Sequence, residues 1–244
     1  MRMEIKDGVK HITLDDTQEH IPQNRQRRRG ETPDLTRKAP VRSTLKRFLI
    51  VCEGKNTETS YFNQFRMPNV SIETVGLGYN TVSLVNKAIE LYSLKSDGQK
   101  PDEVWCVFDK DDFTSQMFSK AIQLATEHQF FCAYSNQAFE YWLILHFIDH
   151  HGEPLHRDEY NTLINGNIKR LGGKYAGKGS KIVNEHLFEI LQAKDPVAKK
   201  TRQELAIERA RRIYKAKSGI PPARAESVTT VFKLVERIIS NYKI

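Results

Sequence analysis

Two apolar runs that end abruptly in acidic residues constrain the fold of this chain more than any other feature. The first, RFLIVCEG, covers residues 47–54, and the second, VWCVFDKDDF, covers residues 104–113. Continuous apolar runs of this length, without polar alternation, are typical of strands buried on both faces of a parallel sheet. Both runs therefore predict strands, and each run places carboxylates where its strand ends.

Strands and helices alternate over residues 47–134. The spacing of apolar residues predicts strands at 47–52, 70–75, 103–108 and 130–134, separated by helices at 57–65, 80–94 and 114–128. This order predicts an α/β fold with a parallel sheet flanked by helices. Ligands of such sheets bind at the carboxyl ends of the strands, which is the edge where both acidic clusters fall.

The rest of the chain differs in character on either side of this region. Residues 1–45 mix proline, amide and basic residues without periodicity, which predicts a flexible basic arm. Residues 46–150 form the predicted sheet domain, and residues 151–244 form a basic, helical C-terminal extension. An apolar helix is expected near 136–147, followed by helices at about 157–170, 180–192, 198–217 and 226–240.

The net charge of +8 is distributed unevenly. Residues 48–168 carry sixteen acids against eight Lys and Arg, whereas residues 22–47 carry two acids against nine. Basic surface attracts phosphate backbones, and an acidic pocket within it suits a divalent cation. The basic runs could equally be solvated faces. The residues expected to contact nucleic acid are Arg27, Arg28, Arg29, Lys174, Lys178, Arg209 and Arg212.

Several classes of protein are excluded by composition. No run of roughly 18 apolar residues could span a membrane, and the polar start MRMEIKD is unlike a signal peptide. The three cysteines lie within apolar runs, without the paired spacing of a zinc site, and are expected to be buried, reduced thiols. These features predict a cytoplasmic protein that has no membrane partner.

Glu53 lies where the first strand ends, directly before Gly54. A carboxylate at this position is partly desolvated, which costs free energy unless a cation or hydrogen-bond donors compensate. The alternative is that Glu53 pairs with Lys55 or caps the following helix.

Asp109, Asp111 and Asp112 follow the second acidic strand. Three carboxylates so close in sequence repel one another and favour either protonation or a hard cation such as Mg²⁺. In an extended segment Asp109 and Asp111 point to the same side, so they could hold one ion jointly or two ions that share a phosphate. Together with Glu53 they are the expected metal ligands.

Three further residues are candidates for supporting catalytic roles. Glu140 lies four residues after Asn136, so both side chains share one helix face and could reach the acidic edge. Alternatively, Glu140 is a buried acid neutralised by Lys110 or Arg66. Lys55 and Lys110 flank the acids, and they could contact a scissile phosphate or serve only as counter-ions.

Three separated motifs resemble the RloB family, a group that includes AbiLii-type abortive-infection proteins. The motifs are VCEGKNTETSYF at 51–62, VFDKDDF at 107–113 and SNQAFEYWLILHF at 135–147, and the resemblance spans about residues 46–240. It implies a TOPRIM-like domain in which Glu53, Asp109 and Asp111 bind Mg²⁺ or Mn²⁺. Gln137 replaces the proline usual in the third motif, which affects only the expected start of the helix.

The resemblance implies a metal-dependent nuclease that acts as a toxic effector in antiphage abortive infection, together with an AAA- or ABC-type ATPase partner. RNA, including transfer RNA, is favoured over DNA as the substrate, and Glu53 or Glu140 could act as general base or acid. The alternative is a non-catalytic binding or regulatory subunit of an ATPase complex. A phosphatase with Asp109 as nucleophile is disfavoured by the bulky Phe113, and an oligomer is compatible with the sequence.

Overall fold

The computed structural model describes residues 2–6, 9–13, 45–78, 81–111, 113–175 and 181–241. The chain divides into two compact units, Met1–Arg42 and Ser43–Ile244. In the first unit, β1 (Arg2–Lys6) and β2 (Val9–Thr13) form an antiparallel pair, where the sequence predicted an arm without regular structure. The sequence signal for this hairpin is the Asp-Gly dipeptide at positions 7 and 8, which is typical of two-residue hairpin connections.

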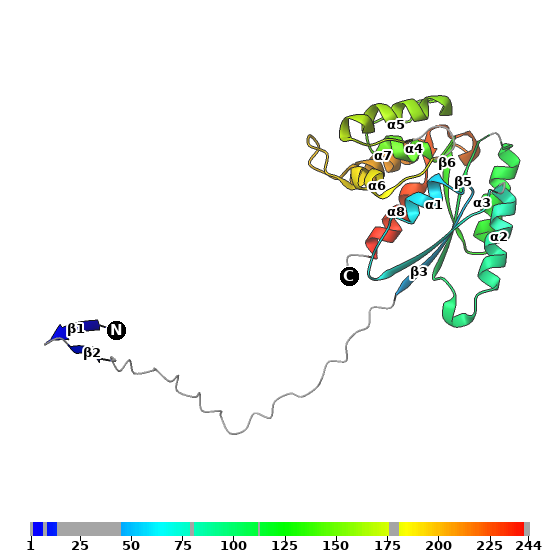
Figure 1. Ribbon diagram of the computed structural model, residues 1–244. Helices are drawn as coiled ribbons and strands as arrows, with labels where there is room; N and C mark the ends of the chain where they lie inside the picture. Colours follow the sequence, from blue (N-terminus) through cyan, green and yellow to red (C-terminus); the bar gives the residue numbers. More distant parts are fainter. Residues whose placement is uncertain are drawn as a thin grey trace, which may run out of the picture. The chain divides into compact units, whose positions relative to one another are not determined.

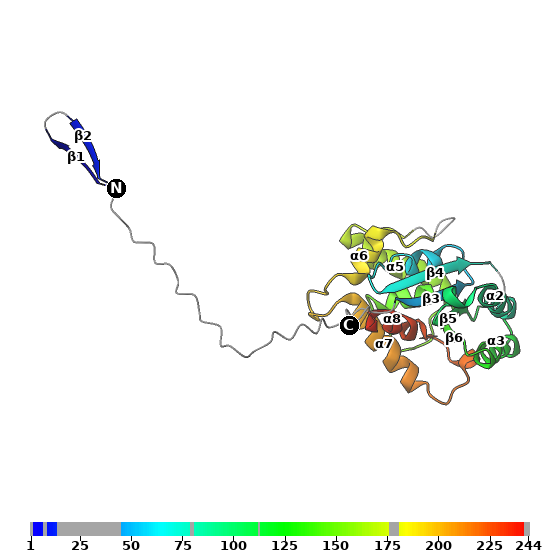
Figure 2. The same cartoon turned by 90° about the horizontal axis from the view of Figure 1, so that it is seen from below.

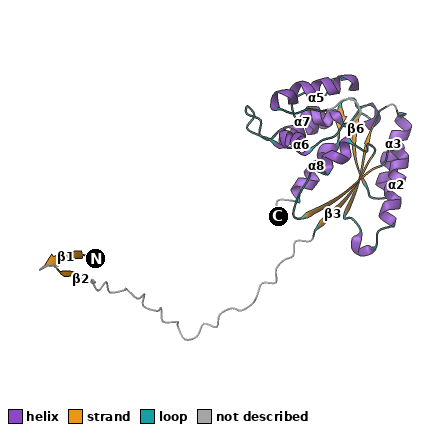
Figure 3. Cartoon of the chain, in the orientation of Figure 1, coloured by secondary structure: helices purple, strands orange, loops and turns teal. Residues whose placement is uncertain are grey.

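The second unit is built on a five-stranded sheet, drawn in orange in Figure 3. The strand order is β4-β3-β5-β6-β7, and every neighbouring pair is parallel except β6 and β7, which are antiparallel. The predicted parallel sheet is therefore confirmed for β4, β3, β5 and β6, and β7 adds an antiparallel edge strand that was not predicted. The strands are β3 (Lys46–Cys52), β4 (Val70–Gly76), β5 (Glu103–Asp109), β6 (Phe131–Asn136) and β7 (Val228–Thr229).

Helices cover both faces of the sheet (Figures 1 and 2). Helices α2 and α3 pack side by side on one face, and α1 and α8 lie on the other, with α4 to α7 beyond them. The helices are α1 (Thr57–Phe62), α2 (Thr81–Ser93), α3 (Ser115–Glu127), α4 (Glu140–Leu145), α5 (Tyr160–Ile168), α6 (Glu185–Gln192), α7 (Arg202–Ala216) and α8 (Val231–Ser240). Short 3₁₀ turns occur at Asp97–Gln99 (η1), Arg157–Glu159 (η2), Lys169–Leu171 (η3) and Pro222–Arg224 (η4).

Burial explains why the two central strands read as continuous apolar runs. Every side chain from Phe48 to Cys52 in β3 is at most 1% exposed, and β5 is buried from Glu103 to Phe108. Both strands have a neighbour on each side and helices on each face, so these central positions do not face water, and only the strand ends are partly exposed. The same environment partly desolvates whatever follows these strands.

Side-chain caps explain why the later helices begin after their predicted starts at 180 and 198. A side-chain oxygen at the N-cap accepts a hydrogen bond from a backbone amide of the first turn, which fixes the helix start. The capping residues are Thr114 for α3, Asn184 for α6 and Thr201 for α7.

The C-terminal helices belong to the same compact unit as the sheet. Arg209 on α7 donates to the carbonyl oxygen of Leu145 at 2.7 Å, and Arg212 pairs with Asp149. These contacts hold α7 against the end of α4. The described residues of the predicted C-terminal extension therefore pack onto the sheet region. Among the described residues, no helix combines the length and apolarity needed to cross a membrane.

Candidate active site

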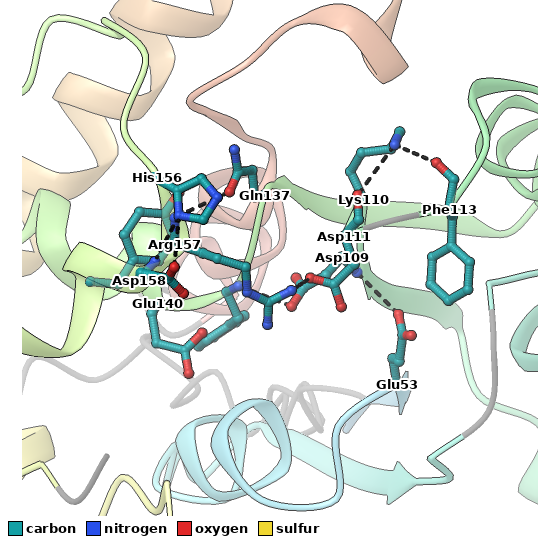
Figure 4. Close-up of polar contacts among 12 residues, drawn as sticks. Glu53, Asp109, Lys110, Asp111, Phe113, Gln137, Glu140, His156, Arg157 and Asp158 are labelled. Carbon is teal, nitrogen blue, oxygen red and sulfur yellow. Dashed lines mark hydrogen bonds and ion pairs between the residues drawn. The ribbon is translucent and has the colours of Figure 1, made fainter. Parts of the chain in front are cut away.

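The two acidic strand ends predicted from the sequence lie next to each other at the carboxyl edge of the sheet. Because β3 and β5 are parallel neighbours, Glu53 follows β3 beside the end of β5. The backbone amide of Asp109 donates to Oε2 of Glu53 at 3.2 Å, although the residues are 56 positions apart. Figure 4 shows the Glu53 side chain directed toward this amide.

Asp111 reaches the same region by a different backbone path from the one predicted. Strand β5 ends at Asp109, and Asp111 has a φ of +38°, so strand alternation does not set the direction of its side chain. Asp tolerates this left-handed region better than most residues. The Asp111 carboxylate forms an ion pair with Arg157, and the Asp109 carboxylate accepts a 3.1 Å hydrogen bond from the amide of Phe139.

Glu58 is a fourth acid at this edge, and no role was predicted for it. It lies in the first turn of α1, is 5% exposed, and packs its carboxylate so closely on Gly54 that a β-carbon there would overlap it. Helical spacing in the sequence could have identified Glu58 as a buried acid. It shares a helix face with Tyr61 and Phe62, which are fully buried. An acid on the buried face of a short helix indicates a site.

Glu140 starts α4 and is also 5% exposed. Its Oε1 accepts hydrogen bonds from the Tyr175 hydroxyl at 3.0 Å and from the Lys181 ammonium at 2.8 Å. The partners predicted for a buried Glu140, Lys110 and Arg66, are not the ones observed. The true partners come from a segment 35 and 41 residues away in sequence, so local spacing could not reveal them.

These carboxylates perturb one another. Burial raises the pKa of Glu53 to about 7, a hydrogen bond from the Asp109 amide opposes the rise, and the charges of Asp111 and Glu58 add to it. Burial and the charge of Glu140 raise the pKa of Glu58 to about 7 as well. The pKa of Asp109 is raised by burial and by its three acidic neighbours. Burial first, and then the neighbouring negative charges, disfavour the ionised forms of Glu53, Glu58 and Asp109.

A cavity of about 300 Å³ opens onto the cluster. Carboxylates and cations both line it: Gly54, Lys55, Asn56, Thr57, Glu58, Asp109, Phe139, Glu140, Arg157 and Lys181. A second cavity of about 400 Å³ is lined by Lys110, Asp111, Asn136, Gln137, His156, Arg157, Ala223, Arg224 and Glu226. Arg157 lines both cavities, and its guanidinium pairs with Asp111, which lines the second. Asn136 therefore lines a different cavity from Glu140, although a shared helix face was predicted for the two.

The two lysines predicted to contact phosphate differ in their placement. Lys55 lines the first cavity. Lys110 turns back onto the carbonyl oxygens of Asp111 and Phe113, on the side away from Glu140 in Figure 4. Its ammonium group therefore donates hydrogen bonds to backbone carbonyl oxygens of the loop after β5. Its catalytic role stays a prediction.

The residues predicted to bind nucleic acid lie outside this cavity or outside the described residues. Arg209 and Arg212 make the intramolecular contacts given above, and Lys174 is exposed. Nucleic-acid contact by these three stays a prediction. Lys178, Arg27, Arg28, Arg29 and the metal-ligand candidate Asp112 lie outside the described residues.

The donor chemistry of the cluster suits Mg²⁺ or Mn²⁺, which prefer carboxylate oxygens. Within the described part of the chain, however, no three His, Cys, Asp or Glu side chains are arranged as a finished metal site. In addition, Arg157 pairs with the Asp111 carboxylate. A cation held jointly by Glu53, Asp109 and Asp111 would have to replace that guanidinium.

Comparisons with known proteins give the family of the chain. The sequence model for the family described as RloB-like protein matches residues 48–238. Comparisons with curated proteins and with solved structures found no match. The matched range includes the strands that carry the acids, the cavity residues and nearly all of α8. The chain therefore belongs to the RloB-like protein family.

Proposed function

We propose that this RloB-like protein is a metal-dependent nuclease that hydrolyses phosphodiester bonds at the edge formed by Glu53, Asp109 and Asp111. The observation that carries the proposal is the meeting of the two acidic strand ends: the Asp109 amide donates to Glu53, and Asp109 lines a cavity together with Glu58 and Glu140. Burial raises the pKa of Glu53 and of Asp109 there. Burying several acids close together weakens a fold, and it is typical of sites whose ligand supplies positive charge.

The residues divide into distinct roles. Glu53 and Asp109 would hold Mg²⁺ or Mn²⁺, joined by Asp111 once it separates from Arg157. A bound ion of this type polarises a phosphodiester and lowers the pKa of a water molecule. Without a bound ion, burial raises the pKa of Glu53 to about 7. Glu53 would therefore serve as a general base or acid only when it does not itself ligate the ion, because a bound cation favours the ionised carboxylate.

The wider role rests on family resemblance and charge. An RNA substrate, including transfer RNA, a toxic effector role in abortive infection and an AAA- or ABC-type ATPase partner are all parts of the proposal. Basic segments such as 22–47 would add salt-sensitive affinity that does not depend on sequence.

A second candidate function is a non-catalytic binding or regulatory subunit of an ATPase complex. Two observations favour it: Asp111 is paired with Arg157, and Glu140 is held by Tyr175 and Lys181. An acid cluster neutralised within the chain could serve structure alone.

Cleavage assays separate the two functions. The full chain is incubated with labelled transfer RNA, messenger RNA, and single- and double-stranded DNA, with Mn²⁺, with Mg²⁺ or with EDTA. Asp109→Asn keeps the shape of the side chain and should slow cleavage by at least about a hundredfold, the scale of losing one essential charged group. Asp97→Asn, at an exposed ion pair with Lys100, is the matched control.

Two results would refute the nuclease proposal. One is the absence of metal-dependent cleavage of every substrate. The other is equal cleavage by the wild type and Asp109→Asn, which would assign the activity to another site. Toxicity on expression in cells gives a second test. A subunit that only binds its partner should stay toxic after Asp109→Asn, whereas a nuclease should lose its toxicity.

A further inference from the structure

The cations of the first cavity suggest how a substrate could approach so many carboxylates. Glu58, Asp109 and Glu140 alone would repel a phosphate group. Arg157 and Lys181 line the same cavity, and their side chains are 38% and 36% exposed. Both cations come from the C-terminal region, and neither was predicted as a site residue.

Arg157 is fixed at both its backbone and its side chain. Its amide donates to Oε1 of Gln137 at 3.1 Å, and its guanidinium pairs with Asp111. In Figure 4 the guanidinium extends from η2 toward the carboxylates of the β5 end. A guanidinium has five N–H donors in a planar fork that matches phosphate oxygens, so an ion pair with one carboxylate leaves it further donors.

Lys181 is held in a similar way. Its carbonyl oxygen accepts a hydrogen bond from the Thr57 hydroxyl at 2.9 Å, and its ammonium group donates to Glu140 at 2.8 Å. The Tyr175 hydroxyl also donates to Glu140 and lies 3.1 Å from the hydroxyl oxygen of Thr57. The network joins α1, α4 and the segment before α6, and it positions an ammonium group with three donors at the cavity.

We infer that Arg157 and Lys181 bind a phosphate group of the nucleic-acid substrate in this cavity and hold it over the acidic cluster. The inference rests on the proposed function, because it takes a phosphodiester as the ligand. The assignment differs from the sequence prediction of Lys110, whose ammonium group is directed to backbone carbonyl oxygens. Because the contact is to phosphate, RNA and DNA of the same sequence should depend on it alike.

Binding without catalysis tests the inference. Fluorescence anisotropy is measured with a short labelled RNA, and with the DNA of the same sequence, in EDTA over a range of salt concentrations. Arg157→Gln and Lys181→Gln should each weaken binding roughly tenfold to a hundredfold, as expected for loss of a charged hydrogen bond. Each should also reduce the salt slope by about 0.7, the value for one phosphate contact on a single strand.

Matched controls come from ion pairs that do not line the cavity. Arg237 pairs with Glu103 at the start of β5, and Lys95 pairs with Glu73 on β4. Arg237→Gln and Lys95→Gln should bind like the wild type. Arg157→Lys should recover part of the affinity and the full salt slope, because it keeps the charge without the fork. Circular dichroism of each variant verifies that it is folded.

The outcomes distinguish this inference from the proposed function. Unchanged affinity and salt slope in both Arg157→Gln and Lys181→Gln would overturn the inference, even if Asp109→Asn abolishes cleavage. Equal losses in the cavity variants and the control variants would overturn it too. Selective losses at Arg157 and Lys181 in a protein that never cleaves would support the inference and refute the nuclease.

Discussion

Glu58→Gln should make the protein more stable at pH 8 and reduce the dependence of its stability on pH. Glu58 is 5% exposed, and burial together with the charge of Glu140 raises its pKa from 4.5 to about 7. Below pH 4.5 the carboxyl group is protonated in both the folded and the unfolded chain. Between pH 4.5 and 7 the unfolded chain loses this proton while the folded chain keeps it, so the free energy of unfolding falls as the pH rises.

The magnitude follows from the size of the shift. One pKa unit corresponds to 1.36 kcal/mol, so a rise from 4.5 to about 7 costs the ionised folded state about 3 kcal/mol. Glutamine has nearly the same shape and no charge, so the variant should be more stable than the wild type by up to about 3 kcal/mol at pH 8. The gain should be much smaller at pH 5.

Urea unfolding at pH 5 and pH 8, in EDTA, measures this difference. Glu127→Gln, at an exposed position on α3, is the control and should change little at either pH. The reasoning is refuted if Glu58→Gln shifts the free energy of unfolding equally at both pH values. It is also refuted if the stability of the wild type does not fall between them.

Three further predictions concern the same edge. Gly54→Ala should cost about 1–3 kcal/mol of unfolding free energy, because its β-carbon would overlap Glu58, and urea unfolding should show a smaller cost in a Glu58→Ala background. Tyr175→Phe removes the hydroxyl that bonds Glu140 and should cost about 1–2 kcal/mol by the same measurement. Mn²⁺ at a hundred times its dissociation constant should stabilise the wild type by about 3 kcal/mol in thermal unfolding, and Asp109→Asn should lose most of that gain.

The sequence was most informative where a residue's environment is set by its own strand. The runs before Glu53 and Asp109 predicted buried parallel strands, and parallel pairing alone brings their ends together. Asp111 departed from the prediction because β5 ends two residues earlier and the backbone turns into the left-handed region. Periodicity describes regular segments, and it says nothing about a residue just beyond them.

Contacts between distant segments were beyond sequence reasoning. Arg157 reaches Asp111 across 46 residues, and Lys181 reaches Glu140 across 41. Arg157 lies in no apolar pattern or motif that would mark it. Lys181 lies at the end of a lysine- and glycine-rich stretch, residues 170–181, which indicates a basic contact or a linker but does not single out this lysine. Strand β7 escaped prediction for another reason, since two residues cannot display a period.

Strand β7 has a consequence for any attempt to isolate the sheet domain. It shields the outer side of β6: its backbone pairs with Ser135 and Asn136, and the Thr230 hydroxyl accepts from the amide of Tyr134 at 2.8 Å. A fragment that stops at residue 150 would lack β7, so the backbone donors and acceptors of β6 would be exposed along an unpaired edge of the sheet. Unpaired sheet edges can pair with strands from other copies, so such a fragment should self-associate more readily than the longer chain.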